Sequence, residues 1–192
     1  MNITNVMFSG IGGQGILTSG RLLALAALDA GLDVKMSEVH GMSQRGGNVD
    51  THVRFGEEVP ASLIPKGGAH YLVSFEKLEG LRYLEFLRPD GIAFVNALEV
   101  APLTINLKRP AYVDDIDAVL KAKAPNLVMI DAIPMAKELG DIRLVNVLML
   151  GALSRKLDLD QEHWDAAIKS RFKEKFHAGC MAAFQMGSGL VS

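Results

Sequence analysis

Apolar runs alternate with helical patterns along the N-terminal part of the chain. A short apolar run at residues 3–9 ends in glycines, and a Leu- and Ala-rich stretch follows from about Gln14 to Ala30. A strand, a tight turn and a helix in this order are typical of the opening of an α/β unit. The helix is apolar on nearly every side except at Arg21, so we expect it to be heavily covered. The segment Leu32–Val39 predicts the second strand.

A different pattern follows, in which apolar and polar side chains alternate. The alternating positions are Val49, Thr51, Val53 and Phe55 against Asp50, His52 and Arg54, and Gly56 closes the run. Alternation with a period of two indicates a half-buried strand, and the glycine that ends it is typical of a hairpin. We therefore expect an antiparallel excursion that interrupts the parallel winding.

The strand and helix pattern then resumes. Pro89, Asp90 and Gly91 mark the turn between a predicted helix and the strand after it. Pro134 suits the first turn of another helix. The predicted elements of this part are strands at Ala69–Phe75, Gly91–Asn96 and Asn126–Ala132, and helices at 77–87, at 113–124 and around Pro134.

The C-terminal part has the pattern of helices alone. Asp141–Leu157 is apolar almost throughout, which predicts a buried helix, whereas residues 160–172 carry one apolar stripe, which predicts a surface helix. The stripe consists of Trp164, Ala167, Ile168 and Phe172, and a last helix from about Lys175 repeats it with Phe176, Gly179, Cys180, Ala183 and Phe184. The whole pattern predicts one α/β domain, residues 1–192, with a Rossmann-like, doubly wound and mostly parallel sheet, an antiparallel hairpin excursion and a helical C-terminal part.

Composition and charge narrow the class of protein. The 192 residues are 49% hydrophobic and 22% charged, with a mean hydropathy of +0.20, which favours a globular chain with a further interface. A formal net charge of −2 provides no basic face for nucleic acid or anionic lipid. The single cysteine, Cys180, excludes an intrachain disulfide and an iron–sulfur cluster held by this chain alone. No leader and no membrane-spanning apolar run is recognised, so we expect a cytoplasmic protein.

The first candidate site is the glycine-rich turn GIGGQG. Its glycines satisfy the pattern G-x-G-x-x-G between a strand and a helix, where free backbone N–H groups and the helix dipole favour a phosphate or carboxylate. The candidate residues are Gly10, Gly12, Gly13, Gln14 and Gly15. A dinucleotide also needs an acidic residue after the second strand, and Glu38 is the one good candidate, slightly late in the sequence. Three interpretations stay open: a bound dinucleotide, a tight turn without a ligand, and another anion or a partner chain docked across the turn.

The second candidate site is the polar segment HGMSQRGG between two predicted strands. The forked guanidinium of Arg45 suits a phosphate or carboxylate, and Gly46 and Gly47 let adjacent N–H groups approach the same anion. The other polar candidates of the segment are His40, Ser43 and Gln44. The alternative is that the glycines only shape an irregular loop while Arg45 forms a surface ion pair.

Isolated polar residues are weaker candidates. Glu76 and Asn96 each follow a predicted buried strand, at the edge where ligands of α/β proteins gather, but either can equally cap a helix or close a turn. Asn146 lies in an apolar helix and needs a hydrogen-bond partner, which we expect to be structural. His40 and His52 lack the spacing of a metal-ligand set, so no metal site is predicted.

Several of these motifs together resemble a known family. The stretches SGIGGQGILTSGRLLALAAL, SEVHGMSQRGGNVDTHVRFG and FEKLEGLRYLEFLRPDG with FVN resemble, in order and spacing, the gamma subunit or domain of 2-oxoacid:ferredoxin oxidoreductases. The resemblance runs from about Val6 to Asn96 and more weakly through RLVNVLMLGAL. The HGMSQRGG form of the loop is most similar to the small subunit of the indolepyruvate type, which acts on aryl pyruvates, whereas the 2-oxoglutarate type carries a loop like YGPEMRGG. The resemblance therefore favours an aryl 2-oxoacid.

The resemblance implies a subunit of a heteromeric enzyme that oxidatively decarboxylates a 2-oxoacid, joins the acyl group to coenzyme A and passes electrons to ferredoxin. Thiamine diphosphate, its magnesium ion and the iron–sulfur clusters then belong to other subunits, and this chain carries no catalytic group and is inactive alone. Arg45, Gly46 and Gly47, with the turn Gly12–Gly15 beside them, are expected to form an anion-accepting wall for the phosphates of coenzyme A. Without its partners the chain is expected to form a homodimer.

Two other functions stay open at this point. A free-standing NAD- or flavin-dependent oxidoreductase would use GIGGQG as its nucleotide fingerprint, and a scaffold module would keep the turn without any ligand. Saturable binding of NAD or flavin to the isolated protein would favour the free-standing enzyme. Copurification with a thiamine-binding, cysteine-rich partner would favour the oxidoreductase subunit.

Overall fold

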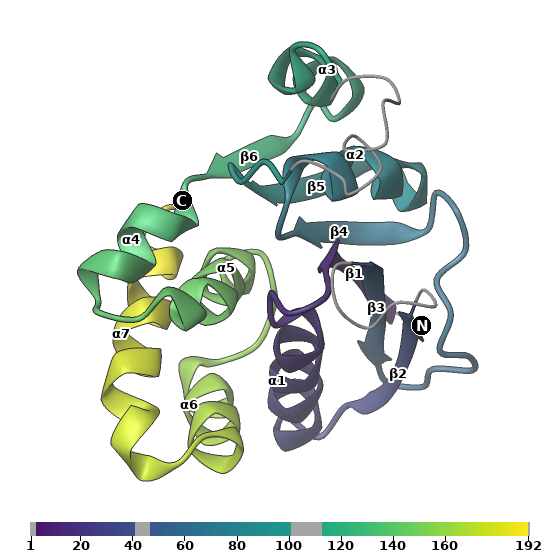
Figure 1. Ribbon diagram of the computed structural model, residues 1–192. Helices are drawn as coiled ribbons and strands as arrows, with labels where there is room; N and C mark the ends of the chain where they lie inside the picture. Colours follow the sequence, from purple (N-terminus) through teal and green to yellow (C-terminus); the bar gives the residue numbers. More distant parts are fainter. Residues whose placement is uncertain (1–2, 41–46, 101–112, 192) are drawn as a thin grey trace.

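The structure is built around one mixed sheet (Figure 1). The computed structural model describes residues 3–40, 47–100 and 113–191. Within these ranges, six strands lie in the order β2-β3-β1-β4-β5-β6. The strands are β1 (Ile3–Ile11), β2 (Asp33–His40), β3 (Asn48–Gly56), β4 (Ala69–Ser74), β5 (Leu87–Asn96) and β6 (Leu127–Ile130).

The strand directions confirm the predicted hairpin excursion. β1, β4, β5 and β6 pair in parallel, whereas β3 runs antiparallel to both β1 and β2. β3 thereby enters the sheet between β1 and β2, and its Val49 lies opposite Gly10 on one side and His40 on the other. The mostly parallel winding is therefore interrupted at one strand only among those described.

Helices cover both faces of the sheet, as a doubly wound fold requires. The helices are α1 (Ile16–Asp29), α2 (Lys77–Tyr83), α3 (Ile116–Lys123), α4 (Ala132–Glu138), α5 (Val145–Ser154), α6 (Gln161–Arg171) and α7 (His177–Ser188), with 3-10 helices at Leu84–Phe86, Ile142–Leu144 and Glu174–Phe176. Alternate residues of β1 enter two different cores. Phe8 packs with α1 and the helices from α4 to α7, whereas Met7 packs with α2 and α3.

The C-terminal helices largely confirm the predicted burial. α5 is buried at every residue from Val145 to Leu153. α6 buries one face only, and the ring of its Trp164 lies 5.2 Å from that of Phe184 in α7. Phe176 departs from the predicted stripe, because it precedes α7 in a 3-10 turn and is 39% exposed. The first helix, α1, is covered on its core side, but Leu28 near its end is exposed.

The sheet differs from the prediction at the start of β5. The helix predicted for residues 77–87 ends as α2 at Tyr83 and continues as a 3-10 helix, and β5 begins already at Leu87. Residues 89–91, predicted to form the turn, lie inside β5, where the pairing with β4 jumps from Ala69–Leu87 to Tyr71–Ile92. Proline and glycine therefore mark an irregularity within this strand and not its boundary.

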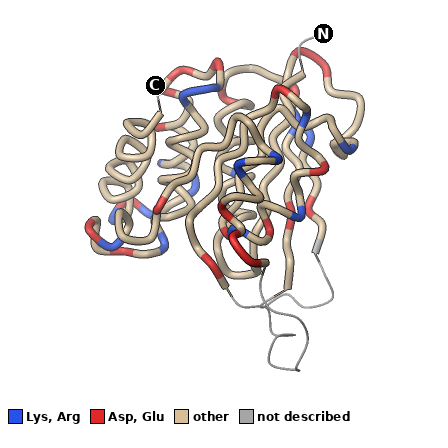
Figure 2. Tube along the Cα trace, turned by 90° about the horizontal axis from the view of Figure 1, so that it is seen from above, with Lys and Arg blue, Asp and Glu red and all other residues tan. Residues whose placement is uncertain are grey.

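Charged side chains of both signs are interspersed along the described trace (Figure 2). This distribution agrees with the small formal net charge of −2. Within the described ranges, none of the helices combines the length and the apolar character that crossing a membrane would require.

Candidate functional site

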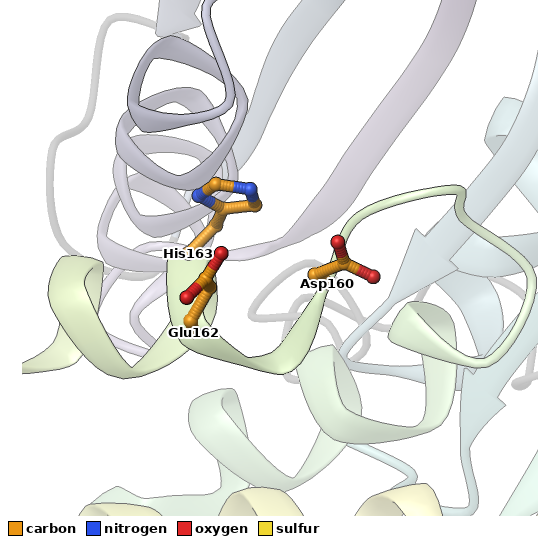
Figure 3. Close-up of side chains that lie close together, drawn as sticks. All are labelled: Asp160, Glu162 and His163. Atoms are coloured by element: carbon orange, nitrogen blue, oxygen red, sulfur yellow. The ribbon is translucent and has the colours of Figure 1, made fainter.

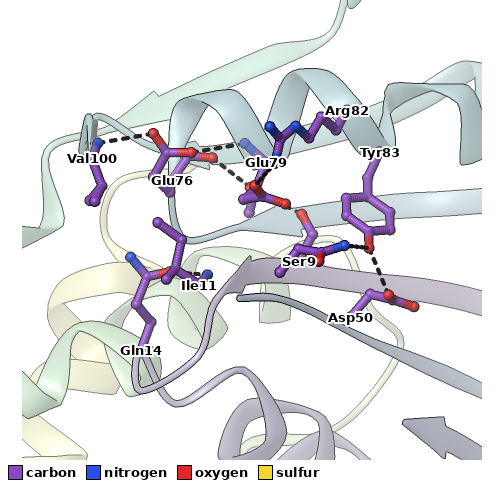
Figure 4. Close-up of polar contacts among 11 residues, drawn as sticks. Ser9, Ile11, Gln14, Asp50, Glu76, Glu79, Arg82, Tyr83 and Val100 are labelled. Carbon is purple, nitrogen blue, oxygen red and sulfur yellow. Dashed lines mark hydrogen bonds and ion pairs between the residues drawn. The ribbon is translucent and has the colours of Figure 1, made fainter. Parts of the chain in front are cut away.

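The glycine turn lies at the carboxyl edge of the parallel strands, between β1 and α1. Gly13 and Gly15 have φ angles of +106° and +87°, a region that favours glycine. The side chain of Gln14 folds back, and its Oε1 accepts a hydrogen bond of 2.7 Å from the N–H of Ile11 (Figure 4). A Cβ on Gly10 would lie 2.6 Å from that oxygen. The side chain of Gln14 therefore stabilises the turn that this motif forms.

Fewer N–H groups of this turn are free than the motif predicts. The N–H of Gly12 donates to the oxygen of Gly47 at 2.9 Å, and that of Gln14 donates to the oxygen of Ile11 at 3.1 Å. The expectation of a fully open cradle is therefore wrong at these two residues. The N–H groups of Gly13 and Gly15 have no hydrogen-bond partner in the part of the chain that is described, so a smaller set of donors remains.

The acidic residue that a dinucleotide would need is not beside the turn. Because β3 lies between β1 and β2, Glu38 of β2 is two ladder spacings, roughly 10 Å, away from β1. Its carboxylate lies 3.5 Å from the guanidinium of Arg21 on α1. The hairpin excursion thus separates the two halves of the dinucleotide pattern.

Most of the polar loop lies outside the described residues. The candidates that fall there are Ser43, Gln44, Arg45 and Gly46, and the side chain of His40 is also outside the description. The described flanks are the end of β2 at His40 and Gly47, which accepts the hydrogen bond from Gly12. Both flanks therefore lie at the same edge of the sheet as the glycine turn.

The carboxylate oxygens of Glu76 accept hydrogen bonds from the backbone of the protein itself. As the N-cap of α2, its Oε2 accepts a hydrogen bond of 2.8 Å from the N–H of Glu79, and its Oε1 accepts one of 3.1 Å from the N–H of Val100 (Figure 4). The residue is 1% exposed. Of the two interpretations of Glu76, capping is the one that its contacts describe.

The side chain of Asn96, at the end of β5, also forms hydrogen bonds with the backbone. Its Nδ2 donates to the oxygen of Phe75, and its Oδ1 accepts from the N–H of Ala132 at the start of α4, both at 3.1 Å. The side chain thus connects the ends of β4 and β5 to α4. Its surface nevertheless forms part of the cavity described next.

A cavity of about 430 Å³, here called the turn cavity, opens between the glycine turn and the start of α5. Its wall includes the turn residues Gly13–Gly15, Asn96 of β5, Arg143 and Asn146. This volume lies within the range of small-molecule sites. The structure therefore joins part of the predicted glycine site to Asn96, while Gly10, Gly12 and Glu76 do not line the cavity.

A second polar group, the Asp50 cluster of Asp50, His52 and Tyr83, lies on the α2 side of the sheet. Figure 4 shows Asp50 and Tyr83. Tyr83 donates to Oδ1 of Asp50 at 2.7 Å, and Nε2 of His52 lies 3.1 Å from Oδ2. The N–H of Ile64 donates to Nδ1 of His52 at 3.0 Å, so Nε2 carries the proton and donates to Asp50. Burial, together with Asp50, raises the pKa of Tyr83 and keeps its hydroxyl protonated. Both nitrogens of His52 are thus engaged in structural hydrogen bonds.

Glu79 is a buried carboxyl near this cluster. It is 4% exposed, its Oε1 lies 2.5 Å from the guanidinium of Arg82, and its Oε2 has no hydrogen-bond partner among the residues that the structure describes. Burial raises the pKa of Glu79, and the nearby carboxylates of Glu76 and Asp50 act in the same direction, while Arg82 opposes them.

Three side chains at the start of α6 have ligand atoms within 4.8 Å of one another (Figure 3). They are Asp160, Glu162 and His163, of which the two acidic residues are exposed. Nδ1 of His163 lies 2.8 Å from a carboxylate oxygen of Asp29 on α1. This hydrogen bond accounts for the position of the histidine, and we assign no metal to the group.

Comparison with known proteins decides the family. The family model for pyruvate ferredoxin/flavodoxin oxidoreductase matches residues 5–190 of the chain. The chain belongs to this family. The resemblance found in the sequence motifs is therefore confirmed.

Curated relatives within the pyruvate ferredoxin/flavodoxin oxidoreductase family carry two kinds of name. The indolepyruvate oxidoreductase subunit IorB of Thermococcus kodakarensis is 38% identical over 188 residues, which are 95% of this chain and 93% of that protein. The protein of the same name from Pyrococcus horikoshii is 37% identical with the same coverage. The pyruvate/ketoisovalerate oxidoreductases common subunit gamma of Pyrococcus abyssi is 28% identical, covering 87% of this chain and 85% of that protein.

Solved structures share the fold. A pyruvate oxidoreductase subunit from Thermotoga maritima superimposes with a TM-score of 0.76 at 21% identity, covering 98% of this chain and 97% of that chain. A 2-oxoglutarate:ferredoxin oxidoreductase from Magnetococcus marinus gives a TM-score of 0.75 at 21% identity, covering 99% of this chain but 31% of that chain. The α/β fold thus occurs both as a chain of similar length and as part of a longer one, and the predicted fold class is confirmed.

Sequence reasoning missed several residues that this family fold brings together from distant segments. Arg143 lies just before the buried helix α5, in a 3-10 turn, and nothing in the neighbouring sequence indicates that it faces the glycine turn. The surroundings of Tyr83 and Glu79 depend on how α2 packs on the sheet, which the sequence does not show. Asn146 alone carried a signal, because a polar residue in an apolar helix requires a partner.

Proposed function

We propose that the chain is the small, gamma-type subunit of a heteromeric 2-oxoacid:ferredoxin oxidoreductase that acts on aryl pyruvates. One observation carries this proposal. The relatives named as indolepyruvate oxidoreductase subunits are up to 38% identical over nearly the whole chain, whereas those named for pyruvate and ketoisovalerate reach 28% over less of it. The loop HGMSQRGG favours the same substrate class.

The chemistry of such an enzyme belongs to cofactors on companion subunits. Thiamine diphosphate supplies the decarboxylation chemistry when bound, and iron–sulfur clusters carry the electrons to ferredoxin. A chain with one cysteine cannot supply the thiolates of a cluster. We therefore place these cofactors and the magnesium ion on partner subunits and expect this chain to be inactive alone.

The contribution of this chain is an anion-accepting wall of the shared active site. Arg45, Gly46 and Gly47 form one part of it in this proposal, and the turn Gly12–Gly15 forms the other. The hydrogen bond between Gly12 and Gly47 supports it, because it fixes the end of the loop against the turn. The phosphates of coenzyme A are the anion that we propose for this wall.

An Arg45→Ala variant of the assembled complex tests this contact. Charge-assisted hydrogen bonds contribute about 1.5–3 kcal/mol, so we expect the KM for coenzyme A to rise roughly tenfold or more. Arg88→Ala is the matched control, because Arg88 pairs with Asp90 in the irregular start of β5 and lines no part of the turn cavity. An Arg45→Ala complex with unchanged KM for coenzyme A and unchanged kcat would refute the contact.

The strand order argues against a free-standing NAD-dependent enzyme. Glu38, which would bind the ribose, is separated from the glycine turn by β3. Titration of the isolated chain with NAD and flavin is expected to show no saturable binding.

In the absence of its partners, we expect the chain to form a homodimer. Apolar side chains such as Leu63 and Ile142 are about half exposed, and covering them favours self-association. Light scattering on the isolated chain measures the molar mass; a monomer at all concentrations would contradict this expectation.

A further inference from the structure

A second cavity, of about 510 Å³, lies on the α2 side of the sheet and is here called the α2 cavity. The Asp50 cluster forms part of its wall, and none of the described residues lines both this cavity and the turn cavity. Asp50 is 6% exposed. The α2 cavity therefore contains a buried carboxylate in its wall, remote from the glycine turn.

The hydrogen-bond partners of this carboxylate are neutral. The hydroxyl of Tyr83 donates to Oδ1 of Asp50 at 2.7 Å (Figure 4), and Nε2 of His52 donates to Oδ2 at 3.1 Å. The ring of His52 is neutral, because its Nδ1 accepts the N–H of Ile64. Two hydrogen bonds replace part of the lost hydration of Asp50, but its negative charge is not balanced by either partner.

The cations near Asp50 are already paired with other carboxylates. The guanidinium of Arg82, which lines the α2 cavity, lies 2.5 Å from Glu79, and the ammonium of Lys66 lies 2.7 Å from Glu85. No salt bridge joins Asp50 to an arginine or a lysine within the described ranges. The α2 cavity thus offers an unbalanced negative charge to a group that enters it.

The remaining wall of the α2 cavity suits a cation on a protein surface. The rings of Tyr83 and Phe86 both line it, with centroids 5.9 Å apart and an angle of 29° between their planes. Aromatic faces attract cations, and a guanidinium stacks on them and is more weakly hydrated than an ammonium. Val39 and Leu63, which also line the cavity, are 46% and 56% exposed, so apolar surface adjoins the charge. A free cation would leave this apolar surface uncovered, whereas a protein partner would cover it.

We propose that the α2 cavity receives an arginine side chain of a companion subunit. The guanidinium pairs with Asp50 beside the rings of Tyr83 and Phe86, and apolar residues next to that arginine cover Leu63 and Val39. This inference rests on the proposed function only in that the arginine belongs to a companion subunit of the same complex.

The first test compares two lysine substitutions in the affinity of the full-length chain for the thiamine-binding companion subunit. Leu63→Lys places a positive charge at the α2 cavity, where it repels an incoming arginine. Leu28→Lys is the matched control, because Leu28 is 54% exposed, as Leu63 nearly is, and lies on α1 away from this cavity. We expect Leu63→Lys to raise the Kd by at least about tenfold and Leu28→Lys to leave it unchanged.

The second test needs no companion subunit. The isolated chain is titrated, with NMR detection, with N-acetyl-argininamide and with N-acetyl-citrullinamide, which has nearly the same shape but no charge. We expect only the arginine probe to shift the ring signals of Tyr83 and His52. Asp50→Asn keeps an acceptor for Tyr83 and removes the charge, so this variant should lose the response. If Asp50→Asn does not fold, the comparison of the two probes in the wild type decides alone.

The outcomes separate this inference from the proposed function. Selective binding of the arginine probe supports the inference even if no companion subunit binds the chain and no complex oxidises a 2-oxoacid. Equal affinity of wild type and Leu63→Lys for the companion subunit would overturn it. So would an arginine probe that binds no better than the citrulline probe. Loss of a homodimer in Leu63→Lys without loss of companion binding would assign the α2 cavity to a second copy of this chain, and would overturn it as well.

Discussion

Gly15 and Asn146 lie against each other although they are far apart in the sequence. Gly15 has a φ of +87°, and the amide of Asn146 occupies the space where its Cβ would lie. Ser19 connects the same two segments, since its hydroxyl lies within 3.4 Å of the backbone oxygens of both Gly15 and Asn146. The shape of the turn therefore depends on α5 as well as on the glycine motif itself.

Gly15→Ala is expected to destabilise the protein more than Gly13→Ala does. Both substitutions place a side chain at a positive φ, which costs roughly 1–2 kcal/mol. Only at Gly15 would the new Cβ also approach Asn146, at 2.6 Å, whereas nothing lies within 4 Å of a Cβ at Gly13. Urea unfolding of both variants measures the free energies, and equal losses would show that the contact with Asn146 does not constrain the turn.

Glu79 is expected to make the stability depend on pH. Because burial raises its folded-state pKa above the unfolded value, the folded protein binds this proton more tightly, and the stability contributed by the protonated form is lost as the pH rises through the folded pKa. Glu79→Gln should therefore flatten the increase in unfolding free energy that the wild type shows on acidification from neutral pH towards the ordinary pKa of glutamate.

The control for this comparison is Glu85→Gln, which removes an exposed carboxylate paired with Lys66. Urea unfolding at several pH values gives the slopes. The assignment is wrong if Glu79→Gln retains the slope of the wild type.

At the scale of single residues, the role of a side chain could be predicted from the sequence only where its position in the chain alone determines that role. Placement of Glu76 directly after a strand correctly suggested capping as one of two interpretations, since a cap depends on nearby backbone. The hydrogen bonds of Asn96 join it to Phe75 and Ala132, which are 21 and 36 residues away, so they could not be inferred from its position. The hydrogen bonds within the Asp50 cluster could not be inferred, because the contact of Tyr83 with Asp50 depends on how α2 packs on β1, β4 and β5. The pattern of alternating residues in β3 gave only the face on which Asp50 and His52 lie.

At the scale of elements, α5 and α7 approach each other at two glycines. A Cβ on Gly151 of α5 would lie 2.0 Å from the oxygen of Phe184, and one on Gly187 of α7 would lie 1.9 Å from the oxygen of Leu148. Backbone atoms cannot rotate away as a flexible side chain can. The two helices therefore pack at a distance that only glycine permits at these positions.

Gly187→Ala is expected to destabilise the protein by about 3 kcal/mol, because the helices must separate and lose packing between their buried faces. Gly179→Ala, in the same helix, is the control. Its Cβ would meet nothing closer than Leu144 at 3.8 Å, so the better helix propensity of alanine should leave stability unchanged or raise it by up to about 1 kcal/mol. Thermal unfolding distinguishes the two, and a Gly187→Ala protein as stable as wild type would contradict this packing.

Element type was predictable from periodicity, and element boundaries less so. The alternation in β3 predicted a strand and the continuous apolar run of α5 predicted a buried helix, as the structure shows. The expectation that β3 is half-buried was wrong, because the strand lies inside the sheet and its polar residues Asp50 and His52 are buried as well. The start of β5 was predicted wrongly because Pro89 and Gly91 are common both in turns and in strand irregularities. Only the pairing with β4 distinguishes these cases.

At the scale of the whole molecule, the two sides of the sheet are unequal. α1 and the helices α4 to α7 form a thick layer on one side, and α2 and α3 cover part of the other (Figure 1). The glycine turn, the flanks of the polar loop and the turn cavity all lie at one edge of this sheet. Sequence motifs predicted that edge as the functional one. The cavity could not be predicted, because its wall combines the N-terminal turn with α5.

The central claim is that this chain gains activity only within a complex, as one wall of an active site whose cofactors lie on partner subunits. Ferredoxin reduction with indolepyruvate and coenzyme A tests it most directly, using the isolated chain, the thiamine-binding partner alone and the two combined. We predict turnover only for the combination, and slower turnover with pyruvate than with indolepyruvate. Turnover by the isolated chain, or full activity of the partner without it, would contradict the account.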